Sequence, residues 1–249
     1  MFVIADNANV TFDNIVFDGQ EHGRIIDAGE ANVTIKNSTL KNATTEPFAK
    51  KVVDGKDTQR YEGGAIYAAH TTLNVENTIF EKNHTKAEVP KPGAPHGGAI
   101  VSYSANITVK GGQFINNYTG AITPQPGANG EGGAIKLHPG STLTINDESV
   151  TEKKTTKFTG NHLDGSGDAG GRQGGAIEAT ESTVSIYGAT FEVKGPFNTG
   201  GAIKFERCKG NHNAIIENCD FTILPNQGDW GFGVAGGAIT SEGSILSIN

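Results

Sequence analysis

Apolar residues return along the chain in fixed columns, each anchored to a four-residue motif. The motif Gly-Gly-Ala-Ile occurs at 63–66, 97–100, 132–135, 174–177, 200–203 and 236–239. In the regular copies, two apolar residues follow the isoleucine seven and nine positions later, and a phenylalanine closes the unit. Apolar residues that alternate with polar ones indicate strands with one buried face. The sequence therefore predicts the same short strands in every copy.

The columns predict a stack of like residues inside a solenoid, because a single copy cannot bury its own apolar face. The isoleucine column is Ile26, Ile66, Ile100, Ile135, Ile177, Ile203 and Ile239, and the last column is Phe17, Leu40, Phe80, Phe114, Phe158, Phe191 and Phe221. Three positions before a residue of the last column, the chain has Asn14, Asn37, Asn77, Gly111, Gly188 and Asn218. Asn and Gly tolerate a left-handed backbone, so we expect a corner at each of these positions.

Parallel strands, repeated corners and apolar columns predict an all-β fold, a right-handed parallel β-helix of about seven rungs. The motif copies lie 26 to 42 residues apart, and the excess length falls before each Gly-Gly pair. We therefore expect long loops on one edge, with the glycines standing where side chains would crowd the next rung. A propeller fits less well, since its blades need antiparallel hairpins. Residues 1–249 are expected to form a single β-helix fragment of a longer protein, truncated at both ends.

Composition and charge narrow the possible partners. The formal net charge is −7 and no basic stripe is present, which argues against a nucleic-acid partner. No apolar stretch approaches the roughly 20 residues that span a bilayer, so no membrane insertion by this segment is expected. Cys208 and Cys219 are the only cysteines. They are expected either to form one disulfide or to be two small buried residues.

The motif also resembles that of a known family. Gly-Gly-Ala-Ile together with Phe-x-x-Asn, here FEKN (80–83), FINN (114–117) and FTGN (158–161), resembles the repeats of chlamydial-type polymorphic outer-membrane proteins and related adhesin-like surface proteins. The resemblance implies an extracellular, cell-surface-attached adhesin that binds a host or neighbouring-cell protein or glycan, with both motifs implicated in adhesion. From the residues themselves we expect the motifs to be scaffold, with ligand contacts on loops and outward faces.

Several loop residues are candidates for ligand binding, because loops on a rigid scaffold concentrate binding residues. The expected loops are 43–62, 84–96, 118–131, 162–173 and 222–235. Trp230, beside Asp229 and Phe232, is either a stacking platform for a sugar ring or a residue that packs the loop. Lys50, Lys51 and Arg60 form a small basic cluster, and Tyr118 begins the third loop.

Two groups of residues are candidates for a divalent metal ion, and no other cofactor is expected. Glu62, His96 and Glu131 each precede a Gly-Gly pair. In a parallel stack they would lie about 4.8 Å apart, either as shared metal ligands or as a polar ladder. Asp164 and Asp168, in a glycine-rich loop, are candidates for Ca²⁺.

The outward residues of one strand suggest a further surface. Thr34, Asn74, Thr108, Thr144 and Ser185 should form one column beside a second column of Asn and Thr residues. Such an array can order water, as in ice-binding solenoids, or can serve only cross-strand hydrogen bonding. Polysaccharide-active enzymes also use the β-helix fold. If this protein were such an enzyme, the best candidates for catalytic residues would be Glu178, Lys204 and Glu206, which could face one groove. We expect no enzyme activity. The leading hypothesis is a non-catalytic adhesin; the alternatives are a polysaccharide-active enzyme and an ice- or surface-binding solenoid.

Overall fold

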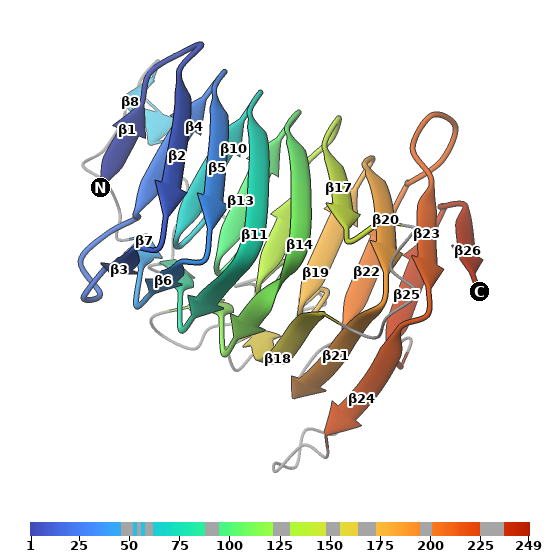
Figure 1. Cartoon of the computed structure of the whole chain (residues 1–249). Helices are drawn as coiled ribbons and strands as arrows, with labels where there is room; N and C mark the ends of the chain where they lie inside the picture. The colour runs from blue at the N-terminus through green and yellow to red at the C-terminus, as the bar shows by residue number, and fades with distance from the viewer. Residues whose placement is uncertain are drawn as a thin grey trace.

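The computed structural model describes residues 1–45, 52–53, 56–57, 62–87, 95–121, 130–147, 155–163, 173–194, 201–224 and 237–249. These residues form strands and turns, and none of them belongs to a helix that is long and apolar enough to cross a membrane. Each strand pairs in parallel with the equivalent strands of the neighbouring repeats, so the chain winds into a parallel β-helix (Figure 1). The predicted fold is confirmed.

The first sheet contains one strand from each rung. Its eight strands are β1 (Phe2–Ile4), β4 (Ile26–Gly29), β10 (Ile66–Ala69), β13 (Ile100–Tyr103), β16 (Ile135–Leu137), β19 (Ile177–Thr180), β22 (Ile203–Glu206) and β25 (Ile239–Glu242). The isoleucines of the motif are in register, with Ile66 between Ile26 and Ile100. The sheet thus spans seven rungs and the start of an eighth.

The second sheet is larger and bends around the core. Its front ladder, in the view of Figure 1, consists of β2 (Asn9–Asp13), β5 (Asn32–Lys36), β11 (Thr72–Glu81), β14 (Asn106–Ile115), β17 (Thr142–Ile145), β20 (Thr183–Tyr187), β23 (Ala214–Glu217) and β26 (Leu246–Ile248). Its lower ladder consists of β3 (Val16–Asp18), β6 (Thr39–Lys41), the second halves of β11 and β14, β18 (Thr156–Leu163), β21 (Ala189–Lys194) and β24 (Asp220–Leu224).

The remaining strands form two smaller groups. A short ladder follows the lower one and comprises β7 (Thr44–Thr45), β12 (His84–Ala87), β15 (Tyr118–Ala121) and the end of β18. The strands β8 (Val52–Val53) and β9 (Lys56–Asp57) pair antiparallel with each other. The short ladder contains residues that the sequence analysis predicts to begin loops, and these residues belong to strands instead.

The predicted left-handed corners join the front ladder to the lower ladder. All six residues have positive φ: Asn14 (57°), Asn37 (50°), Asn77 (44°), Gly111 (66°), Gly188 (54°) and Asn218 (52°). This conformation is costly for most residues and mild for Asn and Gly. The Asn and Gly residues of this column are therefore explained by the left-handed backbone conformation that each corner requires.

The interior consists of the predicted stacks. The rings of Phe80, Phe114, Phe158, Phe191 and Phe221 lie nearly parallel, with neighbouring centroids between 4.7 and 4.9 Å apart. The first four of these rings are buried, and each contributes about 1.5–3 kcal/mol through burial. Because every rung covers the apolar face of the next, the stack forms one continuous core.

The asparagine of Phe-x-x-Asn forms a second internal stack. Asn83, Asn117 and Asn161 are fully buried. The side-chain amide of Asn117 donates to the carbonyl oxygen of Phe80 and to Oδ1 of Asn161, both at 3.0 Å. Its Oδ1 accepts from the side chain and the backbone N–H of Asn83, also at 3.0 Å. This ladder satisfies the polar groups of a buried turn in successive rungs.

The Gly-Gly pairs bring neighbouring rungs into close contact. The first glycine has positive φ, as at Gly63 (63°) and Gly97 (58°). A Cβ on the second glycine would collide with backbone of the following rung: at Gly98 it would lie 2.2 Å from the carbonyl oxygen of Gly133. The predicted crowding is confirmed.

The two cysteines are free thiols, so the disulfide alternative is excluded. Cys208 is buried, and burial raises the pKa of its thiol. Each thiol lies against backbone carbonyl oxygens: Cys208 Sγ is 3.5 Å from that of Ala179, and Cys219 Sγ is 3.2 Å from that of Glu217. They serve as two small packing residues.

Candidate functional site

The outward side of the first sheet carries a polar cluster that begins at the residues before Gly-Gly. Glu62, His96, Glu131 and Gln173 pair through parallel bridges in successive rungs. His96 Nδ1 lies 3.6 Å from Glu62 Oε1, and His96 Nε2 lies 3.4 Å from Glu131 Oε2. The predicted ladder is therefore present, but the two carboxylates contact opposite ring nitrogens. One metal ion cannot bind both nitrogens, so Glu62, His96 and Glu131 do not form the predicted shared ligand set.

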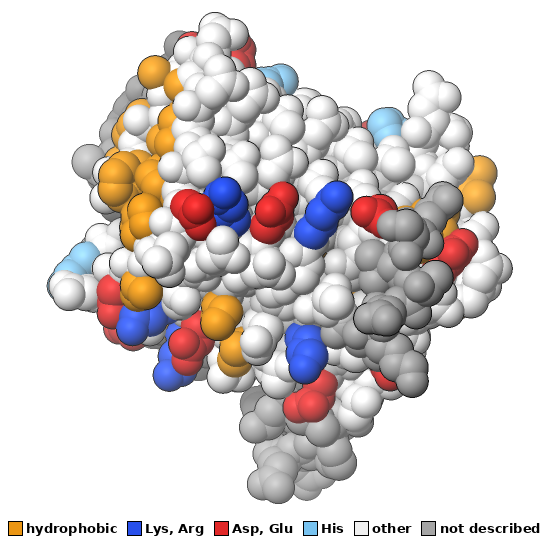
Figure 2. Space-filling model, in the orientation of Figure 1, with side chains coloured by type: hydrophobic (Ala, Val, Ile, Leu, Met, Phe, Trp, Pro, Cys, Tyr) orange, Lys and Arg blue, Asp and Glu red, His pale blue; other side chains and the backbone are white. Residues whose placement is uncertain are grey.

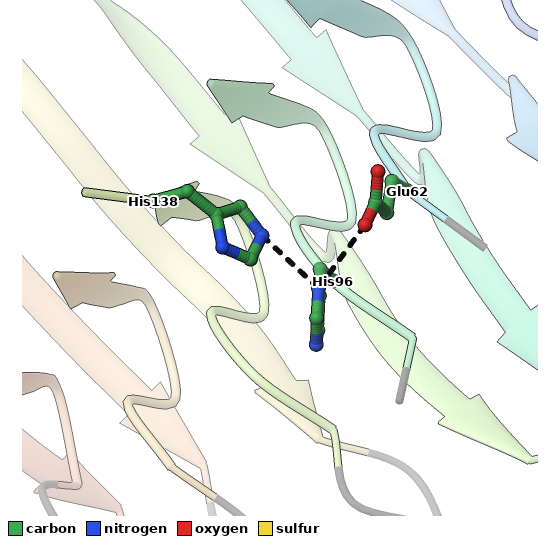
Figure 3. A group of neighbouring side chains, drawn as sticks. All are labelled: Glu62, His96 and His138. Atoms are coloured by element: carbon green, nitrogen blue, oxygen red, sulfur yellow. Dashed lines mark hydrogen bonds and ion pairs between the residues drawn. The ribbon is translucent and has the colours of Figure 1, made fainter. Parts of the chain in front are cut away.

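A different residue completes a metal-type cluster. His138 follows β16 directly, and its Nε2 lies 3.1 Å from His96 Nδ1. Glu62, His96 and His138 each offer a ligand atom, and these atoms all lie within 4.8 Å of one another. Figure 3 shows both contacts meeting at one nitrogen of His96, while the other nitrogen points away. The sequence reasoning missed His138 because it stands in a turn that carries a one-residue insertion.

Aromatic side chains hold this cluster. The ring of Tyr103 stacks on His138, with centroids 4.0 Å apart and planes 6° apart, and its hydroxyl donates to Glu62 Oε1 at 2.5 Å. The ring of Tyr67 lies beside Tyr103 and beneath the guanidinium of Arg24. Arg24 also donates to the backbone carbonyl oxygen of Glu62 at 2.6 Å. The backbone and the side chain of Glu62 are thus both held in place.

Glu131 links the histidines to buried charges. Burial alone would raise the pKa of its carboxyl, but Lys136, with Nζ 2.8 Å away, and His96 together hold the pKa below its usual value. The carboxylate form of Glu131 is therefore favoured, and its Oε2 faces His96 Nε2 at 3.4 Å. Lys136 is itself buried, which lowers its pKa, and it also contacts Glu178 and Thr180.

The three candidates for catalytic residues, Glu178, Lys204 and Glu206, form ion pairs on the outward side of the first sheet. Glu178 is fully buried and paired with Lys136. Lys204 Nζ lies 3.3 Å from carboxylate oxygens of Glu206 and of Glu242 and also contacts Gln173. Sharing lysines among these carboxylates compensates the charge that burial would otherwise make costly.

The front ladder presents the predicted double column. Thr34, Asn74, Thr108, Thr144 and Ser185 pair in register, and all five are half-buried with their outward faces accessible. Asn32, Thr72, Asn106, Thr142 and Thr183 form the neighbouring column. The column that contains Asn32 begins one rung earlier at Asn9, and the column that contains Thr34 begins at Thr11. The Thr34 column ends at β23, where Ile215 takes the next position after Ser185. We call these two columns the Asn/Thr face; it is the uncharged area above the charged row in Figure 2.

That charged row was not found from the sequence. Figure 2 shows acidic and basic side chains alternating across the front ladder. The row is Asp13, Lys36, Glu76, Lys110 and Asp147. Lys36 Nζ lies 3.3 Å from Asp13, and Lys110 Nζ lies 3.5 Å from Asp147. The signal was present in the alignment, since the sign alternates at one position of four successive copies, from Asp13 to Lys110. Asp147 stands one residue beyond that position in the next copy.

The loop candidates have two different outcomes. Tyr118 lies within β15 of the short ladder, where its ring stacks between His84 (4.7 Å) and His162 (5.1 Å). Tyr118 therefore belongs to a strand of the short ladder, and the prediction that it lies in a loop was wrong. The other candidates lie outside the described residues: Trp230, Asp229, Phe232, Lys50, Lys51, Arg60, Asp164 and Asp168.

Comparison with known proteins defines the class. Residues 2–191 match the family model described as a right handed beta helix region. The chain therefore belongs to the right-handed β-helix family, and its fold is a right-handed parallel β-helix. No curated protein and no solved structure gave a significant match. The fold is compatible with adhesins and with polysaccharide-active proteins, so the surfaces described above must distinguish these functions.

Proposed function

We propose that the protein is a non-catalytic, cell-surface adhesin that binds a glycan or protein of a host or neighbouring cell through the Asn/Thr face. The observation that carries the proposal is the continuous array of amide and hydroxyl groups on a rigid wall. Each group both donates and accepts hydrogen bonds. The rungs repeat about every 4.8 Å, which suits an extended ligand with regularly spaced hydroxyl groups.

The surroundings of the Asn/Thr face support a neutral, polar ligand that contacts this face and not the repeat motifs. The charged row beside the Asn/Thr face alternates in sign, so neighbouring charges compensate each other. The repeat motifs are scaffold: the isoleucines, phenylalanines and asparagines that define them in the inner rungs are buried. Any contribution of these motifs to adhesion is then indirect, through the wall that they build.

The state of the carboxylates supports a binding role over glycoside hydrolysis. A glycosidase needs a carboxylic acid with a raised pKa beside a second carboxylate roughly 5–10 Å away. Glu178 and Glu206 are each paired with a lysine, and the pKa of Glu131 is lowered. Each of these three carboxyls thus lies beside a lysine, and a nearby cation favours the ionised form over the protonated form that a general acid needs.

Adding a positive charge to the Asn/Thr face is expected to weaken ligand binding at least tenfold. Thr108→Arg places a long cationic side chain in the middle of the array, where it blocks several rungs. Gln113→Arg is the matched control, since Gln113 is exposed on the lower ladder of the same strand. Glycan-array, host-matrix and whole-cell binding of the purified chain would be measured. Equal binding by the two variants, or depolymerisation of any polysaccharide by the wild type, would overturn the proposal.

The in-register threonines favour ice binding as a second candidate function. Thr11, Thr34, Thr108 and Thr144 occupy one column of the Asn/Thr face, and Asn74 interrupts it. If this column orders water, the purified protein shapes growing ice crystals and Thr108→Arg abolishes the effect. Normal ice growth in the presence of the folded wild type rules this function out.

A further inference from the structure

We propose that Glu62, His96 and His138 form a binding site for a divalent transition metal ion of the zinc type, with one coordination position open. This inference concerns the outer side of the first sheet and does not depend on the function proposed for the Asn/Thr face. The three side chains come from three successive rungs, and they converge without any rearrangement of the backbone (Figure 3).

The distances suit a tetrahedral ion. Zinc bonds of about 2.0–2.1 Å place neighbouring ligand atoms roughly 3.3–3.4 Å apart. His96 Nδ1 is 3.1 Å from His138 Nε2 and 3.6 Å from Glu62 Oε1. Both values lie within about 0.3 Å of the tetrahedral edge. The ligand atoms of His138 and Glu62 lie within 4.8 Å of each other, so these two side chains have to move closer together when an ion binds. Small side-chain rotations would therefore complete the geometry around a central ion.

The partners of His96 orient it as a ligand. Its Nε2 faces a side-chain oxygen of Glu131 at 3.4 Å, and an oxygen acceptor at that nitrogen favours the tautomer with the proton on Nε2. The lone pair of Nδ1 then points toward His138 and Glu62. A carboxylate on the far nitrogen of a metal-binding histidine is a recurrent arrangement, since it fixes the ring and increases its basicity. Lys136 in turn holds Glu131.

The other two ligands are also held before any ion binds. His138 is stacked against Tyr103, and the hydroxyl of the same tyrosine contacts Glu62. Such preorganisation is what a metal site requires of its supporting residues. The side chain of His96 is 16% exposed, which leaves a route from solvent.

The ligand types select the metal. Imidazole nitrogen suits Zn²⁺, Ni²⁺ and Cu²⁺, whereas Ca²⁺ and Mg²⁺ take oxygen ligands. Two histidines and one carboxylate are a common set for zinc when a fourth position holds water or another ligand. The Glu62–His96–His138 site therefore favours zinc over calcium or magnesium.

The test is a calorimetric titration of chelator-treated full chain with Zn²⁺. We expect one ion per chain, and no binding of Ca²⁺ or Mg²⁺ under the same conditions. Co²⁺ should give the intense visible bands of a four-coordinate ion. His138→Ala is expected to lower Zn²⁺ affinity by about 100-fold or more, and Glu131→Gln, which alters a positioning residue, by about 10- to 100-fold. His22→Ala is the matched control, because His22 is exposed on the first rung.

Other results would overturn the inference. They are absence of Zn²⁺ binding by the wild type, a six-coordinate Co²⁺ spectrum, or equal affinity in wild type and His138→Ala. Loss of binding in His162→Ala instead would place the ion at the His84–Tyr118–His162 stack. Circular dichroism of each variant separates loss of the site from loss of the fold. If His138→Ala does not fold, the stoichiometry and the Co²⁺ spectrum of the wild type decide.

Discussion

Gly98→Ala is expected to lower the free energy of unfolding by about 3 kcal/mol or more, the upper range for overpacking a rigid site. A Cβ at this position would lie 2.2 Å from the carbonyl oxygen of Gly133 and 2.6 Å from backbone N and O of Tyr118. These are backbone atoms on two sides, so no side chain can rotate away. The rungs would have to separate, which would also disturb the stacks beside them.

Gly23→Ala is the control for this substitution. A Cβ at Gly23 meets no heavy atom within 4 Å, and its φ lies outside the left-handed region. The same chemical change there should leave stability within about 0.5 kcal/mol of the wild type. The two variants would be compared by their urea midpoints at equal concentration. If the midpoints agree, close contact at the second glycine is not what the motif requires.

Asn117→Ala is expected to cost about 3–5 kcal/mol, because it leaves several buried polar groups without partners. An unsatisfied buried group costs about 1–3 kcal/mol. The backbone N–H of Asn83 loses its acceptor and the carbonyl oxygen of Phe80 loses the side-chain amide that donates to it. Oδ1 of Asn161 loses one of its two donors and keeps the backbone N–H of residue 117.

Asn106→Ala in the same rung is the matched control. Asn106 is exposed at the start of β14, so its truncation should change stability by less than about 0.5 kcal/mol. Thermal and urea unfolding of both variants would be compared, with near-ultraviolet spectra as a measure of packing. A similar loss in both variants would mean that the internal asparagine ladder contributes no more than a surface residue.

The solenoid could be predicted from the sequence because each of its requirements recurs at the same position. An isolated Asn77 would be weak evidence for a left-handed corner, but Asn14 and Asn37 stand at the same place and share the conformation. The same holds for the paired glycines, whose close approach to the next rung repeats at Gly64 and Gly98. Repetition thus converts weak local preferences into a specific fold.

The site was harder to predict because it joins residues at different positions of different rungs. His138 approaches His96 across 42 residues, and the two do not share a repeat column. Tyr118 was placed in a loop because its strand has four residues, too few to show alternation. The position of Glu131 was predicted, but its contact with the opposite nitrogen of His96 depends on side-chain direction, which spacing does not give.

Because the charges on the front ladder alternate in sign from rung to rung, it matters whether an odd or an even number of rungs is removed or added. Removal of one internal rung, such as residues 62–95, would bring Lys36 beside Lys110, and like charges directly opposite each other are destabilising. Removal of two adjacent rungs would restore an acidic residue next to a basic one. Duplication follows the same rule. On this face, the length of the solenoid can change more readily in steps of two rungs than in steps of one.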